Sequence, residues 1–207
     1  MRFSERQLYD ALTATWIEVQ REAAGDRYGG VRGEADFWRG FLNRVRSLLD
    51  GGELTDDAFA TLSAHFRLPG SWRVFDDVLP VLDELAARGL SLAVVSNWDS
   101  FLPRLLELKG LASRFSAVSV SAIEETGKPE PEIFLRTCRR LGVAPAEALH
   151  VGDAPREDYD GARGAGLHAL LLDRKDQHSG RPERIRSLAE IPQRLTARAP
   201  AGGENGT

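Results

Sequence analysis

The sequence predicts an α/β fold, with a doubly wound parallel sheet preceded by a helical region. From Asp76 onward, helical stretches that end at glycines alternate with short, continuously apolar runs, which are typical of parallel strands buried on both faces. Before Asp76 the apolar residues recur at helical spacing. We therefore expect a helical region over residues 1–72, an α/β core over 73–196 and a disordered tail over 197–207.

Three helices are predicted in the first 70 residues. Ser4 and Gln7 form a capping box at the start of the first helix, and a glycine-rich stretch ends it. The second helix is predicted over 35–49, where apolar residues repeat every three or four positions. Thr55 can cap a third helix that ends before Gly70. No strand is expected in this region.

In the second region, four helices alternate with four strands, and each helix is followed by a glycine suited to a left-handed C-terminal position. Functional residues of such sheets lie at the carboxyl ends of the strands. The expected helices cover 76–89, 100–109, 130–141 and 156–165, and the expected strands cover 91–95, 115–121, 148–151 and 168–173.

Composition excludes several classes of function. A net charge of −4 argues against a surface that holds nucleic acid or an anionic membrane. No apolar run approaches the roughly 20 residues of a membrane span, and the N-terminus does not resemble a signal peptide. The single cysteine, Cys138, cannot form an internal disulfide, which favours a cytoplasmic protein.

Polar residues follow the first predicted strand in the order Ser96, Asn97, Trp98 and Asp99. Ser96 and Asn97 could bind an anion through a hydroxyl and backbone N–H groups, whereas Asp99 is expected to cap the next helix. Ser96 could equally belong to that capping turn. Trp98 is placed either to line a substrate mouth or to pack under the helical region.

Lys128 is one of three lysines in the chain and precedes Pro129 and Pro131. A lysine in a loop is by default a solvated residue. Here rigid backbone holds it where strand ends converge, and a point positive charge suits a phosphate or a developing anion.

Asp153 ends the third predicted strand and Asp158 follows on the first turn of the next helix. Two carboxylates close together repel unless a cation lies between them, and oxygen ligands suit Mg²⁺. The alternative is that both acids complement the positive end of a helix.

Taken in order, the three stretches resemble the later motifs of the haloacid dehalogenase-like hydrolase superfamily. They read VVSN with Ser96, GKPEPEIF with Lys128, and HVGDAPREDYDGA with Asp153 and Asp158. The resemblance extends over about 71–173. It implies a Rossmann-like core, and the helices before it resemble the cap domain that one subclass inserts ahead of the second motif.

The resemblance also implies residue roles. Ser96 and Lys128 would hold the phosphoryl group, with Asn97 and Trp98 beside the substrate, and Asp153, supported by Asp158, would ligate Mg²⁺. The substrate would be a small phosphorylated metabolite. The 2-haloacid dehalogenases of the superfamily lack Mg²⁺ and tend to have Ser-Asn where this chain has Gly152-Asp153, so a phosphatase is favoured over a dehalogenase.

One family motif is missing from the 207 residues. The D-x-D-G-T motif, whose first Asp is the nucleophile, does not occur, and Asp76 and Asp77 are expected to be helix caps. Its strand is central in the family, so we expect an open slot between strands 91–95 and 148–151 and no catalysis. A misplaced start codon is the explanation we favour. A truncated gene and a non-catalytic binding derivative are the others, and the codons upstream of Met1 test them.

Overall fold

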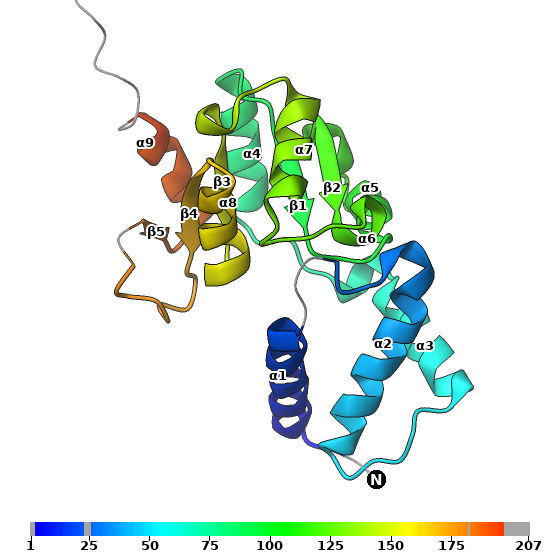
Figure 1. Ribbon diagram of the computed structural model, residues 1–207. Coiled ribbons are helices and arrows are strands. Elements are labelled where there is room, and N and C mark those ends of the chain that lie inside the picture. Colours follow the sequence, from blue (N-terminus) through cyan, green and yellow to red (C-terminus); the bar gives the residue numbers. More distant parts are fainter. Residues whose placement is uncertain (1–2, 23–25, 182, 197–207) are drawn as a thin grey trace, which may run out of the picture.

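In the computed structural model, the described residues are 3–22, 26–181 and 183–196. The predicted tail over 197–207 lies outside them. The N-terminal part contains α1 (Glu5–Glu22), α2 (Gly30–Ser47) and α3 (Asp56–Phe66), which lie together on one side of the strand-containing part (Figure 1). The prediction of three helices in this region is confirmed.

Local capping explains the ends of these helices. The Ser4 hydroxyl accepts the backbone N–H of Gln7, and Thr55 caps α3 by accepting the N–H of Ala58, both as predicted. Helix α2 starts five residues earlier than expected. The Asp26 carboxylate causes this, because it accepts the backbone N–H of Gly30 at 2.6 Å and so supplies an acceptor ahead of the first turn.

The second part alternates helices and strands as predicted. The differences are the short strand β5 and helix α9, which were not expected, and a six-residue π-helical turn over Pro155–Asp160 in place of most of the fourth predicted helix. Its elements are α4 (Val78–Ala87), β1 (Ala93–Ser96), α5 (Leu102–Leu108), β2 (Ala117–Val120), α6 (Ser121–Glu124), α7 (Pro131–Leu141), β3 (Leu149–Gly152), α8 (Gly161–Gly164), β4 (His168–Leu172), β5 (Arg184–Ile185) and α9 (Ile191–Thr196).

Apolar residues on both faces of β4 explain its continuously apolar sequence. Ala169 and Leu171 pack under α7 and α8, whereas Leu170, which points to the opposite face, packs with residues of α4 and α9. Successive side chains of a strand alternate between the faces of a sheet, so a strand covered on both sides has no polar positions. The predicted parallel α/β architecture is therefore confirmed.

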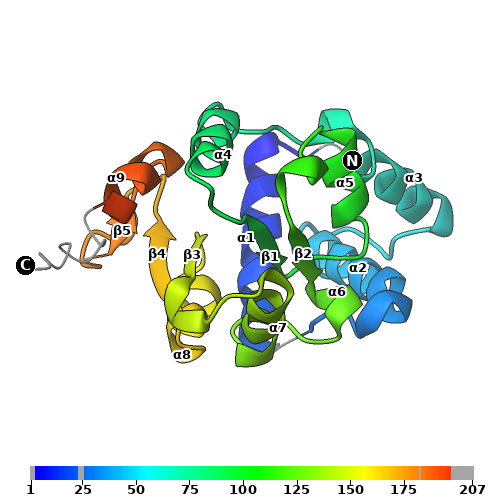
Figure 2. The same cartoon turned by 90° about the horizontal axis from the view of Figure 1, so that it is seen from above.

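The strands form two separate parallel sheets among the described residues. β1 pairs only with β2, with Ala93 opposite Ala117, and β3 pairs with β4, which pairs with β5. Figure 2 shows β1 and β3 apart, with α4 and α7 on opposite sides of the gap between them. A cavity of about 390 Å³ occupies this place, where the resemblance predicted an open slot.

Asp77 corrects one expectation. It lies at the start of α4, but its carboxylate makes no capping hydrogen bond. It accepts two hydrogen bonds from Arg174, at 2.8 and 2.9 Å, and one from the Ser187 hydroxyl. A two-point bond from a guanidinium is stronger than a bond from a backbone N–H, and the Arg174 hydrogen bonds lower the pKa of Asp77 well below its ordinary range. Asp76 also makes no capping bond and lies beside Arg73.

Within the described ranges, no helix is both long and apolar enough to cross a membrane.

Candidate active site

Lys128 is held in place by the side chain of Asn97. The Asn97 amide nitrogen donates to the Lys128 carbonyl at 2.7 Å, and the Lys128 backbone N–H donates to the Asn97 amide oxygen at 2.7 Å. This two-point contact joins the carboxyl end of β1 to the loop before α7. Asn97 was predicted to bind substrate, and the structure gives its amide a positioning role that the sequence did not suggest.

The Lys128 amine reaches the carboxylate of Asp158. Its Nζ lies 2.5 Å from Asp158 Oδ1, and the side chains are 11% and 4% exposed. His150 Nε2 lies 2.9 Å from the same oxygen, and the Ala154 backbone N–H donates to Oδ2 at 2.9 Å. Both oxygens of Asp158 are therefore engaged by protein groups.

The environment of Asp158 keeps it ionised. Burial raises its pKa, but the hydrogen bond with His150 and the positive charge of Lys128 outweigh burial and hold the pKa well below its ordinary value. The contribution of Asp158 to stability is thus present above the unfolded-state pKa of about 3.9 and is lost as the pH falls below it.

This sign gives a pH prediction. Between pH 7 and pH 3, we expect the free energy of unfolding of the wild-type chain to fall by more than that of an Asp158→Asn variant, because only the wild type must protonate Asp158 to lose its ion pair. Urea unfolding at both pH values measures the two losses. Equal losses in the two proteins would show that Asp158 does not titrate abnormally.

Two glycines allow this close packing. A Cβ on Gly152, the last residue of β3, would lie 2.2 Å from Asp158 Cγ. A Cβ on Gly161 would lie 2.9 Å from Cα of Pro129, so Gly161 lets α8 approach the lysine loop. Side chains at either position would separate the carboxylate from the amine.

Asp153 lies at the end of β3 and is exposed. No hydrogen bond or ion pair from another described residue reaches its carboxylate, and no group of three or more His, Cys, Asp or Glu among those residues could hold a metal ion. A single available carboxylate fits a Mg²⁺ ion that keeps its waters and takes substrate oxygens, but it forms no cage. Metal binding by Asp153 and Asp158 stays a prediction.

The structure thus brings Asn97, Lys128 and Asp158 into one hydrogen-bonded chain. Ser96 is half-buried at the carboxyl end of β1, and its predicted contact with a phosphoryl group stays a prediction. Sequence reasoning missed His150, which it treated as a core or edge residue. A titratable side chain two positions before the end of an apolar strand was the available signal.

The helical region contacts the same strand ends. The Trp38 indole N–H donates to Asp99 at 2.9 Å, and the Ser100 backbone N–H and hydroxyl donate to Glu34 at 2.5 and 2.8 Å. The other Asp99 oxygen accepts the Phe101 N–H at the entry to α5. Spacing along the chain carries no signal for these contacts, because their partners are more than 60 residues apart.

A further contact pairs Arg27 with Glu157, the residue before Asp158. The Arg27 guanidinium lies 2.5 Å from the Glu157 carboxylate, and the side chains are 2% and 13% exposed. The helical region is therefore joined to the loop after β3 as well as to the loop after β1.

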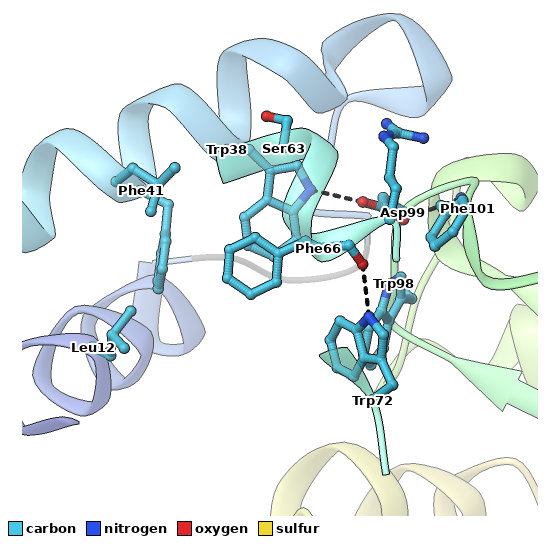
Figure 3. A pocket seen from close by; sticks show the side chains of 11 residues that line it. Leu12, Trp38, Phe41, Ser63, Phe66, Trp72, Trp98, Asp99 and Phe101 are labelled. Atoms are coloured by element: carbon cyan, nitrogen blue, oxygen red, sulfur yellow. Dashed lines mark hydrogen bonds between the residues drawn. The ribbon is translucent and has the colours of Figure 1, made fainter. Parts of the chain in front are cut away.

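Trp98 lies between the two regions. It lines a cavity of about 110 Å³ with aromatic side chains from α2, α3 and the loops after α3 and β1 (Figure 3). Its ring packs edge-on against Trp72, with centroids 4.8 Å apart. Packing under the helical region is thus present in the structure, and a substrate contact by Trp98 stays a prediction.

The Trp38–Asp99 bond can be tested by a matched pair of substitutions. Trp38→Phe leaves a buried carboxylate oxygen without its donor and is expected to cost about 1–3 kcal/mol of unfolding free energy. Trp72→Phe removes a bond to the Phe66 carbonyl, which is exposed to water, and should cost less. Urea denaturation compares them. A larger cost for Trp72→Phe would contradict this account.

Fold and strand-end geometry define an α/β protein with a helical region over its strand ends and a buried lysine–aspartate pair there. The family model for haloacid dehalogenase-like hydrolases matches residues 4–166. The chain therefore belongs to the haloacid dehalogenase-like hydrolases.

Relatives and solved structures are consistent with this family. The chain is 37% identical over 147 residues to haloacid dehalogenase-like hydrolase domain-containing protein 3 of Danio rerio, covering 69% of this chain and 61% of that protein. It is 35% identical over 162 residues to phosphoserine phosphatase of Thermus thermophilus, covering 74% and 65%. A phosphatase structure from Thermococcus onnurineus superposes with a TM-score of 0.63 at 28% identity, covering 91% and 86%. The chain thus spans less than two thirds of the two relatives.

Proposed function

We propose that the protein belongs to the Mg²⁺-dependent phosphatases of this family and that its substrate is a small phosphorylated metabolite. The observation that carries the proposal is the Lys128 amine held on Asp158 at the meeting point of β1, the lysine loop and β3. A fixed cation at this edge suits the oxygens of a transferring phosphoryl group. The phosphatase name of one relative supports the same class.

Each proposed residue has a separate task. Lys128 binds phosphoryl oxygens, Ser96 donates a hydrogen bond to them, and Asp158 holds the amine in place. Asp153 would hold Mg²⁺, which neutralises charge on the phosphoryl group when bound. We also propose a cytoplasmic location, supported by the single cysteine, Cys138, which is free and buried.

The 207-residue chain is expected to show no turnover by itself, because it contains no D-x-D-G-T sequence to supply a nucleophile. The test compares this chain with the same chain preceded by an apolar strand ending in D-x-D-G-T, using p-nitrophenyl phosphate with and without Mg²⁺. Only the extended chain should hydrolyse it. Lys128→Met in the extended chain should lower kcat about 100-fold or more.

Two outcomes would contradict the proposal. Metal-dependent hydrolysis by the 207-residue chain would show that its own residues suffice. Inactivity of the extended, folded chain would remove the phosphatase assignment.

A second candidate is a non-catalytic derivative that binds phosphate or a metal. The full engagement of both Asp158 oxygens by protein groups favours it. Calorimetric titration of the 207-residue chain with Mg²⁺ and inorganic phosphate separates the candidates. A phosphatase lacking its nucleophile should bind them weakly, whereas a binding protein should bind at least one of them tightly.

A further inference from the structure

The two sheets present facing edges that no described strand occupies. β1 hydrogen-bonds to β2 on its other side, and β3 hydrogen-bonds to β4 on its other side. The facing edges run in the same direction. Their carboxyl ends meet through Asn97, Lys128 and Asp158, and Leu92 and Leu149, near their amino ends, line one cavity.

This cavity has the surroundings of a buried strand. Its volume is about 390 Å³, its two walls are β1 and β3, and helices α4, α7 and α9 contribute to its lining. Most lining side chains are apolar, and those of Ala93 and Val95 on β1 and Leu149 and Val151 on β3 come from the strands themselves. We name this cavity the strand slot.

Backbone chemistry selects what can fill the strand slot. Each wall is the free edge of a parallel strand, which offers N–H donors and carbonyl acceptors at regular spacing. A small apolar ligand would leave these groups unpaired, whereas an extended polypeptide pairs with both edges at once. Each wall strand has four residues, so the complementary segment needs about four or five residues at about 3.3 Å per residue.

We propose that the strand slot receives an extended segment of another polypeptide, a run of about five small or β-branched apolar residues lying parallel to β1 and β3. Backbone pairing gives the affinity, and the apolar lining excludes charged side chains from the run. This interaction does not depend on the proposed phosphatase function.

Cys138 provides a reporter within the wild-type chain. It is the single cysteine, lines the strand slot from α7, and is 4% exposed. A segment seated in the slot covers this thiol. Its rate of reaction with 5,5′-dithiobis(2-nitrobenzoic acid) therefore measures whether the slot is filled.

The probe is the peptide Lys-Lys-Val-Ala-Val-Ala-Val-Lys-Lys, with a control that carries N-methyl groups on alternate residues of the apolar run. The control keeps the side chains but loses backbone donors. At saturating concentration, the first peptide is expected to slow the thiol reaction at least tenfold and to raise the Tm, and the control to do neither. No protection by the first peptide, or equal protection by both, would overturn the proposal.

A variant with a filled slot gives a second test. Ala93→Trp places a large ring in the strand slot and should weaken binding of the fluorescently labelled peptide at least tenfold, measured by anisotropy. Ala86→Trp is the matched control, because Ala86 is exposed on α4 and does not line the slot, and its affinity should be unchanged. Thiol protection that rises with chain concentration without peptide would overturn the proposal in favour of self-association.

Discussion

Replacing Asp158 with alanine is expected to lower the free energy of unfolding by about 3–5 kcal/mol, because it leaves the Lys128 amine buried without its counter-charge. The amine lies 2.5 Å from the carboxylate and its side chain is 11% exposed, so water replaces little of the lost interaction. His150 and the Ala154 N–H lose the same partner. Urea denaturation at pH 7 measures the loss.

The neighbouring acid is the matched control. Asp153→Ala removes a carboxylate that is exposed and should change stability by no more than about 0.5 kcal/mol. Adding Lys128→Met to Asp158→Ala should recover much of the loss, since the unpaired charge is then removed. Similar effects of the two alanine substitutions would show that the Lys128–Asp158 pair does not stabilise the fold.

Gly152→Ala is expected to cost about 3 kcal/mol, at the upper end of the usual cost of overpacking. The added Cβ would lie 2.2 Å from Asp158 Cγ and 2.4 Å from its Oδ2. The Asp158 side chain would have to move away from Lys128 and His150 to make room. Thermal and urea unfolding measure this cost.

Gly164 in α8 supplies the control for this substitution. A Cβ there would meet no atom within 4 Å, and alanine is a better helix former than glycine, so Gly164→Ala should be neutral or stabilising by up to about 1 kcal/mol. Gly152→Ala and Asp158→Ala should also cost less together than the sum of their separate effects, because both break the same contacts. Additive losses would place the role of Gly152 elsewhere.

Much of the local structure could be predicted from the sequence. Glycines at 89, 110, 142 and 166 were expected after helices, and each adopts a positive φ that L-residues avoid. Continuous apolar runs predicted buried parallel strands, and the residues at their carboxyl ends include Lys128 and Asp158. These signals depend on near neighbours in the chain, which is why they are visible without a structure.

Other features depended on partners far away in the sequence. Asp77 was predicted to cap α4, but Arg174, 97 residues later, binds it instead. His150 looked like a residue of a buried strand, and only the fold placed its ring on Asp158. The two-residue strand β5 pairs with β4 and is too short to show a pattern of its own.

The sequence by itself determined the order of helices and strands and the residues at the strand ends, because periodicity, capping and glycine conformation act over a few residues. Only the tertiary structure decided that Lys128 binds Asp158, that Asn97 holds the lysine backbone, and that the facing edges of β1 and β3 enclose a cavity. Burial and hydrogen bonding between distant segments decide such contacts, and these depend on how the layers pack.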